Sequence, residues 1–232
     1  CEFCQNYSIS QFTDHECKYL SPDELCVLAR DSQARGIVFT YSEPTIHYEY
    51  VQEVALKTTV AIKSNGFMMP HVLSGLSKSI MAWNIDIKGD SSSYINTCKG
   101  YLSPVMSNIE YIFGKSHLEL SYLVLPSMID NVEFHTYIRD WIADISDDIP
   151  VHMLYCYPVY KMEQHYNKDS LLKVYDILSE KLNYVYISNV YGEYARRNTL
   201  CKQCGSLMIE RNPAGKVHKI ECCGRNIKGL FS

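Results

Sequence analysis

Cysteine pairs at both ends of the chain are the residues whose type and spacing could do chemistry. Cys1 and Cys4 form a Cys-x-x-Cys pair, and four more cysteines cluster near the other end: Cys201, Cys204, Cys222 and Cys223. A Cys-x-x-Cys pair can be a redox dithiol, half of a zinc site or part of an iron–sulfur loop. A thioredoxin-type dithiol ranks low, because "CEFCQNYSIS" leads into a polar loop and follows no strand.

The cysteine-rich tail, "CKQCGSLMIERNPAGKVHKIECCG", resembles a zinc ribbon. "SLMIER" and "KVHKIE" are the expected hairpin strands, with "NPAG" as the turn. Cys201 and Cys204 make a good first knuckle, whereas Cys222 and Cys223 are adjacent, and His218 is an alternative fourth ligand. The pattern favours a structural zinc site over a metal-free ribbon or a local disulfide.

Composition narrows the class of protein. The chain has 232 residues, 47% of them hydrophobic, and a net charge of −4. This balance argues against a nucleic-acid partner, and no apolar run is long enough to cross a membrane. Ten cysteines in a chain of this length favour reduced, metal-binding thiols in the cytoplasm over a secreted disulfide scaffold. The scattered cysteines are interpreted as packing residues or loop thiols: Cys17, Cys26, Cys98 and Cys156.

Six predicted strands alternate with helices along the chain. "SPDE" at 21–24 is a capping box that starts the first long helix. Further helices are expected at about 46–57, 71–78, 103–112, 132–145 and 169–182. The predicted strands are "GIVFTY", "TVAIKSN", "MAWNIDIKG", "HLELSYLVLP", "PVHMLYCYP" and "NYVYISNV". Such alternation predicts parallel strands, in an α/β barrel, whole or partial, or in an open doubly wound sheet.

Polar and turn-forming residues gather at the carboxyl ends of these strands, in "TYSEPT", "SNG", "DIKG", "LPSMID", "YCYP" and "SNVYG". Parallel strands place all these ends on one rim, where such folds bind ligands. The sequence therefore predicts a ligand-binding rim.

Seven segments in this order resemble the radical SAM enzymes: "CEFCQNYSIS", "GIVFTYSEPTIHYEYV", "SNGFM", "NIDIKG", "LVLPSMID", "YPVYKM" and "YVYISNV". The match is best to the AmmeMemoRadiSam-system radical SAM proteins, relatives of the pyruvate formate-lyase-activating enzymes. The family's cluster loop is Cys-x-x-x-Cys-x-x-Cys, so Cys1 and Cys4 would be its second and third cysteines. The resemblance places a first strand and the first cysteine upstream of Cys1. It implies a partial barrel over residues 1–198 and a ribbon-like tail over 199–232.

The resemblance also implies the chemistry. A [4Fe–4S] cluster held by three thiolates leaves one iron open for S-adenosylmethionine (SAM), whose reductive cleavage gives a 5′-deoxyadenosyl radical that abstracts hydrogen from substrate. The expected partners are an electron donor of flavodoxin or ferredoxin type and a protein or peptide substrate. That substrate would be a glycyl-radical enzyme, as for the activases, or a target tied to AMMECR or Memo domains.

A rival hypothesis is a non-catalytic metal-binding scaffold, in which Cys1 and Cys4 join the tail cysteines in zinc sites. A nicotinamide-dependent enzyme is a weaker alternative, because no glycine-rich fingerprint follows any strand.

Site residues follow from the same resemblance at the first rim segments. Phe3 matches an aromatic position near the adenine, with plain packing as the alternative. Glu43 aligns with the glutamate of a Gly-Gly-Glu segment that meets the methionine ammonium; it would equally suit the start of the next helix. Tyr41 and Ser42 replace the two glycines. Asn65 and Gly66 look like a turn.

Later strands add further candidates for the nucleotide site. Asn84, Asp86 and Lys88 alternate along one strand and share a face. The resemblance puts them near the methionine and ribose of SAM, and an internal ion pair is the alternative. His152 is expected at the rim, and Asn189 would contact adenine or ribose, or cap a turn. The remaining histidines are interpreted as surface or packing residues. No catalytic residue is predicted.

Overall fold

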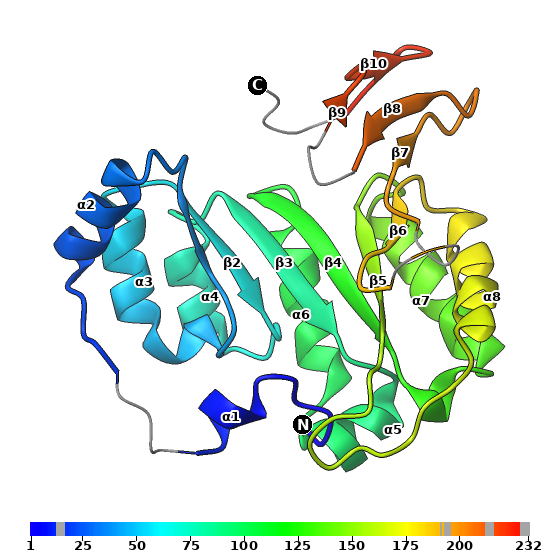
Figure 1. Ribbon diagram of the computed structural model, residues 1–232, viewed down its shortest axis with the longest axis horizontal. Helices are drawn as coiled ribbons and strands as arrows, with labels where there is room; N and C mark the ends of the chain where they lie inside the picture. Colours follow the sequence, from blue (N-terminus) through cyan, green and yellow to red (C-terminus); the bar gives the residue numbers. More distant parts are fainter. Residues whose placement is uncertain (13–16, 191, 193–195, 212–215, 228–232) are drawn as a thin grey trace.

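A six-stranded parallel sheet with helices on one face forms most of the computed structural model (Figure 1). The structure describes residues 1–12, 17–190, 192, 196–211 and 216–227. The strands lie in chain order: β1 (Ile37–Phe39), β2 (Val60–Ser64), β3 (Ala82–Ile87), β4 (His117–Val124), β5 (Val151–Tyr155) and β6 (Val185–Ile187). Every neighbouring pair is parallel. The α/β partial barrel predicted from the sequence is confirmed.

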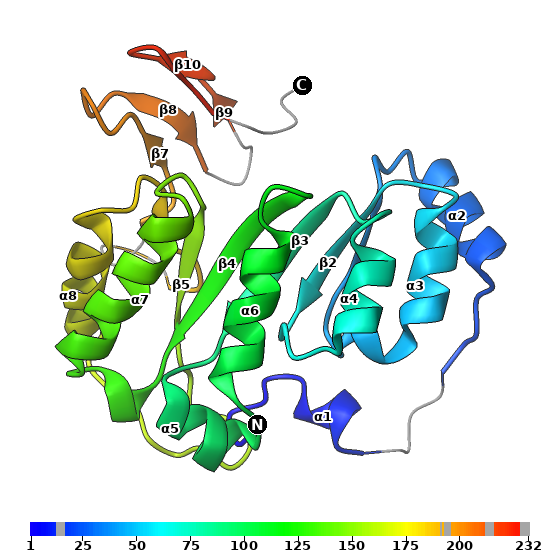
Figure 2. The ribbon, with the colours of Figure 1, turned by 180° about the vertical axis from the view of Figure 1, so that it is seen from behind.

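Within the described residues, the longer helix α2 (Pro22–Asp31) precedes β1, and five more connect successive strands: α3 (Tyr48–Ala55), α4 (Pro70–Leu76), α6 (Leu102–Ile112), α7 (Val132–Ile145) and α8 (Lys168–Ser179). Helices α4, α6 and α7 lie behind the sheet in Figure 1 and in front of it in Figure 2. Short helical segments fill the loops: α1 (Tyr7–Ser10), η1 (Pro44–His47), α5 (Ser91–Ser93), η2 (Tyr94–Cys98) and η3 (Pro126–Met128).

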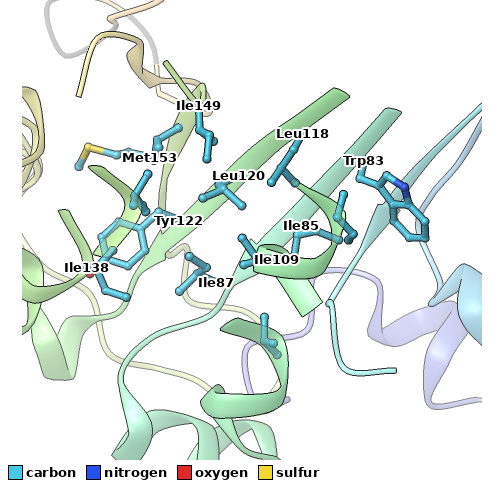
Figure 3. Packing of buried hydrophobic residues seen from close by; sticks show 14 of the residues in the cluster. Trp83, Ile85, Ile87, Ile109, Leu118, Leu120, Tyr122, Ile138, Ile149 and Met153 are labelled. Carbon is cyan, nitrogen blue, oxygen red and sulfur yellow. The ribbon is translucent and has the colours of Figure 1, made fainter. Parts of the chain in front are cut away.

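The two faces of the sheet differ in chemistry because strand side chains alternate. Trp83, Ile85 and Ile87 point from β3 into the core, where Ile109 of α6 packs against them (Figure 3). Burying each such side chain contributes about 1.5–3 kcal/mol. The opposite face, which we call the open face, carries polar side chains: Lys63, Asn84, Asp86, Glu119, Ser121 and His152.

Local signals in the sequence set most helix boundaries. The predicted capping box is present, because Ser21 Oγ accepts from Glu24 N at 3.3 Å and Glu24 Oε2 accepts from Ser21 N at 2.8 Å. The helix expected from residue 46 instead begins as the 3-10 turn η1 and continues as α3, because Pro44 follows the capping residue Glu43. Segments α5 and η2 were not predicted; Asp90 caps α5 by accepting from Ser93 N at 2.8 Å.

The tail forms small antiparallel sheets. Strands β7 (Thr199–Leu200), β8 (Leu207–Glu210) and β9 (Lys216–Val217) make one sheet, and β10 (Glu221–Cys222) pairs with β11 (Arg225–Asn226). The predicted hairpin strands are therefore present, whereas the "NPAG" turn lies outside the described residues. Cys201, Met208 and Ile209 form a small core of their own. The boundary at 198/199 remains a prediction.

The two ends of the chain lie at opposite ends of the sheet. The amino terminus and α1 lie at the carboxyl ends of the strands, and the tail lies beyond their amino ends (Figures 1 and 2). Within the described part of the chain, no helix combines the length and apolarity needed to span a membrane.

Candidate functional site

The Cys1–Cys4 loop crosses the predicted rim and is fixed there by backbone hydrogen bonds. Glu2 N donates to Thr97 O at 3.2 Å, and Lys161 N donates to Glu2 O at 2.9 Å. These contacts join the loop to η2 and to the segment that follows β5. Residues distant in sequence thus place the cysteine pair over the carboxyl ends of the strands.

The loop turns its aromatic side chain inward and leaves its thiols accessible. Cys4 N donates to Cys1 O at 3.3 Å, which closes a tight turn. Phe3 is 6% exposed and belongs to the main core, as the packing interpretation predicted. Cys1 is exposed and Cys4 is partly buried. Both thiols are free to bind a metal, and the contact of Phe3 with adenine remains a proposal.

The segment after β1 keeps a glycine-like backbone without glycine. Tyr41 has φ of +75°, in the left-handed region that favours glycine, and its carbonyl accepts from Asn6 Nδ2 at 2.7 Å. Tyr41 and Ser42 stand where the family that the sequence resembles has two glycines, and Tyr41 has a backbone conformation that glycine adopts readily. Tyr41 is 73% exposed, so its ring does not offset the strain by packing.

Glu43 joins the loops that follow β1 and β2. Its Oε1 accepts from Thr45 N at 3.3 Å, Thr45 Oγ1 at 2.7 Å and Ser64 Oγ at 2.7 Å, and its Oε2 accepts from Asn65 N at 2.8 Å. Glu43 therefore caps η1, as the helix-start alternative predicted. The same carboxylate places a negative charge at the rim.

The predicted turn after β2 is present. Asn65 Oδ1 accepts from Phe67 N at 2.7 Å, and Gly66 has φ of +71°. Asn108 Nδ2 donates to the carbonyls of Gly66 and Met68 at 2.8 and 3.0 Å. Asn65 thus has a local structural contact, and its contact with a nucleotide remains a proposal.

Asp86 is the centre of an ionic network on the open face. It binds Lys63 Nζ through Oδ1 and Lys88 Nζ through Oδ2, each at 2.7 Å. Lys63 Nζ also donates to Asn84 Oδ1 at 2.6 Å and Ser121 Oγ at 2.9 Å. The internal ion pair predicted as the alternative is present, and Lys63 is a member that the sequence did not reveal.

Electrostatics keeps this network charged. Burial by itself would raise the pKa of Asp86, but Lys88 and Lys63 outweigh burial and lower it. Burial opposes the charge of Lys88 as well, yet Asp86 raises its pKa above the ordinary value. Two lysines around one carboxylate leave a net positive charge, which suits an anionic group such as a carboxylate.

A second polar group lies deeper in the open face, and we call it the floor. Glu119 contacts His152 Nε2 at 2.7 Å and His117 Nε2 at 3.0 Å, and His152 Nδ1 lies 3.2 Å from Ser188 Oγ. Burial works against ionisation of Glu119, but the two histidines lower its pKa. His152 was expected at the rim; it is instead the second residue of β5, near the amino end of the strand. Glu119 was not predicted, and His117 was interpreted as a surface or packing residue, whereas it contacts Glu119.

Asn189 lies at the rim, where its side chain has a structural role. Its Oδ1 accepts from Tyr155 N and its Nδ2 donates to Tyr155 O, both at 2.8 Å. The amide thereby extends the pairing of β5 and β6 beyond Ile187. These contacts differ from the turn cap expected as the alternative, because the side chain pairs with the backbone of Tyr155, and a contact with adenine or ribose remains a proposal.

The tail cysteines converge. The thiols of Cys201, Cys204, Cys222 and Cys223 all lie within 4.8 Å of one another. Cys223 and Gly224 have φ of +53° and +74° in the two-residue turn between β10 and β11, a type I′ geometry. This turn lets adjacent cysteines face the same point. His218 contacts Glu210 at 3.3 Å instead and does not belong to the group.

These four thiols oppose one another's ionisation. The Ser206 hydroxyl, 2.9 Å from Cys204 Sγ, is the main contact that lowers the pKa of Cys204, to about 6. The neighbouring Cys204 and Cys222 raise the pKa of Cys223 to about 12. A divalent metal removes this repulsion, and four thiolates are a ligand set of structural zinc.

The structure separates the two cysteine groups. Cys1 and Cys4 lie beyond the carboxyl ends of the strands, and the tail group lies beyond their amino ends (Figure 1). The two groups are therefore too far apart to share one metal ion, and in the scaffold hypothesis each would need a zinc ion of its own. All ten cysteines, each within the described residues, are free thiols.

Solved structures of radical SAM proteins share this fold. A domain of pyruvate-formate lyase-activating enzyme from Bacteroides vulgatus matches with a TM-score of 0.56 and 14% identity over 66% of this chain and 99% of that chain. Streptococcus suis SuiB bound to S-adenosylmethionine matches with a TM-score of 0.59 and 13% identity, over 78% of this chain and 46% of that chain. A radical SAM methyltransferase from Sphaerobacter thermophilus matches with a TM-score of 0.56 and 12% identity, over 81% and 62% of the two chains. The chain thus has the partial-barrel fold of radical SAM proteins.

One curated protein is similar in sequence. The chain is 32% identical over 225 residues to the uncharacterized protein MJ0808 of Methanocaldococcus jannaschii. The match covers 91% of this chain and 66% of that protein, so the chain spans slightly less than two thirds of its relative. No family model matches the chain.

Proposed function

We propose that this protein is a radical SAM enzyme. The observation that carries the proposal is the Cys1–Cys4 loop, hydrogen-bonded across the carboxyl ends of a parallel partial barrel whose open face is polar. Such ends bind ligands in this class of fold. The likeness of fold to radical SAM proteins supports the same conclusion.

Cys1 and Cys4 fit two of the three thiolate positions of a [4Fe–4S] cluster. In the family that the sequence resembles, the first cysteine of the cluster loop precedes this pair. Cys1 and Cys4 would hold such a cluster, which would supply the electron for reductive cleavage of SAM and so the chemistry for hydrogen abstraction. The loop is held at the rim by backbone hydrogen bonds that join Glu2 to Thr97 and Lys161.

The rim and the part of the open face next to it would hold SAM. Lys88 and Lys63 offer positive charge for the methionine carboxylate, while Asp86, Asn84 and Asn65 offer polar groups for the ribose. Glu43 already accepts from four donors, so it would act on the methionine ammonium through its charge and through neighbouring carbonyls. Tyr41, Ser42 and Asn189 lie on the same rim, and Phe3 would pack near the adenine. His152 would face the substrate rather than the nucleotide.

The substrate class follows from the resemblance, and we propose a protein or peptide. A glycyl-radical enzyme is one form of this proposal; a target tied to AMMECR or Memo domains, in an AmmeMemoRadiSam system, is another. SuiB has been solved bound to a precursor peptide. We also propose a flavodoxin- or ferredoxin-type electron donor and a cytoplasmic location.

For the tail we propose a structural zinc ion. Four convergent thiols, with a Cys-x-x-Cys-Gly knuckle in which Gly205 N donates to Cys201 O at 2.7 Å, support it. Gly205, with φ of +69°, provides the turn of that knuckle.

Anaerobic reconstitution of the full-length natural protein with iron and sulfide tests the proposed activity. We expect a brown iron–sulfur chromophore and, after addition of dithionite and SAM, release of 5′-deoxyadenosine. The Cys4→Ala variant should lose both, whereas Cys17→Ala, which removes an exposed thiol elsewhere, should keep both. Zinc bound at both ends of the protein, with no iron cluster, would support the scaffold hypothesis instead.

A further inference from the structure

A tyrosine of the neighbouring strand lies beside the floor on the same face of the sheet, because Tyr186 is the register partner of His152. The ring of His152 stacks on the ring of Tyr186 from β6, with centroids 5.3 Å apart and planes 28° apart. Tyr186 is 5% exposed, so its ring has little freedom to move. Tyr186 is therefore one of the contacts that fix His152, together with Glu119 and Ser188.

The tail holds this tyrosine. Tyr186 Oη lies 2.8 Å from Thr199 Oγ1 of β7. The guanidinium carbon of Arg211 lies 4.7 Å from the centre of the Tyr186 ring, within the range of a cation–π contact. Arg211 Nη1 also donates to Thr199 Oγ1. One arginine of the tail thus contacts both the ring and the hydroxyl partner of Tyr186.

Arg211 is itself fixed by the tail backbone. Its amide N donates to Asn198 Oδ1 at 2.9 Å, and its Nη1 donates to Arg197 O at 3.1 Å. Arg211 directly follows β8, which pairs with β7, and the Cys201–Cys204 knuckle connects these two strands. The cysteine group and Arg211 therefore lie at opposite ends of one hairpin.

We propose that Arg211 is a positioning residue that sets the floor of the open face, acting through Tyr186 on His152 and Glu119. The tail would then be part of the substrate-binding site and not only an appendage. The role in substrate binding rests on the proposed function; the contacts between Arg211, Tyr186 and His152 do not.

The test uses histidine side-chain NMR on zinc-loaded protein labelled in histidine, with the His152 signals assigned from a His152→Gln variant. In Arg211→Ala we expect the His152 signals to shift more than those of any other histidine, and zinc to stay at the wild-type ratio. Arg211→Lys keeps a cation over the ring and should restore the His152 signals in part. Lys216→Ala, which removes an exposed cation of the same tail, should leave them in place.

Variants of Tyr186 test the same contact from the barrel side, in case the arginine variants do not fold. Tyr186→Phe keeps the ring and should shift His152 less than Tyr186→Leu, which removes it. Unchanged His152 signals in Arg211→Ala with zinc retained would overturn the proposal. A shifted His152 in a protein that never cleaves SAM would support the positioning role and contradict only the proposed function.

Discussion

At the scale of single residues, the site combines strained and charged positions that must be held by their neighbours. Tyr41 keeps a left-handed backbone that glycine adopts more readily, and Asp86 holds two lysines on the open face. The sequence predicted Asp86 and Lys88 because they alternate along one strand. Lys63 was not predicted, because only the register of β2 against β3 brings it to Asp86.

Replacing Tyr41 tests the backbone strain. A non-glycine residue in the left-handed region costs about 1–2 kcal/mol. Since the Tyr41 ring is largely exposed, Tyr41→Gly should be more stable than Tyr41→Ala by about 1 kcal/mol. Urea denaturation of both variants measures the difference. Equal stabilities would show that the turn relaxes around any residue.

Asp86→Asn tests the ionic network. Without the carboxylate, Lys63 and Lys88 repel each other, so the free energy of unfolding of the variant should be lower by about 2 kcal/mol. This value is reduced because solvent screens the partly exposed Lys63. The lowered pKa of Asp86 means that its contribution is complete above the unfolded value of 3.8 and is lost as the pH falls through the lower folded value.

The difference in unfolding free energy between wild type and Asp86→Asn should therefore be constant from pH 5 to 8, because this range lies well above the ordinary carboxyl pKa of about 3.9. The difference should shrink in stronger acid. Denaturation midpoints across this range measure it. Asp176→Asn, at an exposed position on α8, is the control. A gap that grows in acid would contradict the assignment.

At the scale of elements, hydrophobic alternation and helix caps were enough to predict the sheet. All six strands and the boundaries of α7 agree with the sequence, because apolar strands and capping residues are local signals. His117 and Glu119 share one face of β4 by the same alternation, but the floor could not be predicted, since His152 reaches Glu119 only through the pairing of β4 with β5. The convergence of Cys222 and Cys223 depends on a turn type that the sequence does not display.

Gly66 shows how an element limits substitution at the rim. A Cβ at Gly66 would lie 2.6 Å from Ile85 Cγ2 and 2.9 Å from Val105 Cγ1, whereas one at Gly114, with φ of +79°, would meet nothing within 4 Å. Both substitutions to alanine carry the cost of positive φ, so their difference measures the clash. We expect the free energy of unfolding, measured by urea denaturation, to fall by about 3 kcal/mol in Gly66→Ala and by about 1 kcal/mol in Gly114→Ala. Similar losses would mean that α6 shifts to make room.

At the scale of the whole molecule, the tail and the barrel have separate cores, joined where Arg211 meets Tyr186. The small tail core of Cys201, Met208 and Ile209 is too limited to fold alone, which is typical of ribbons that depend on a metal.

Zinc removal tests this dependence. The protein should bind one zinc per chain in the tail, and a chelator should raise hydrogen exchange in β7–β11 while β2–β5 remain protected. Cys223→Ser should weaken zinc retention, and Cys17→Ser should not. Loss of protection throughout the sheet on chelation would show that the tail and the barrel fold as one unit.

The distance between the two cysteine groups has a practical consequence for handling the protein. Air would oxidise an iron–sulfur centre at the accessible Cys1–Cys4 loop, and loss of that centre would leave a zinc site at the other end of the sheet in place. Material purified in oxygen would then be well folded, zinc-loaded and inactive, so a good melting curve says nothing about competence for radical chemistry.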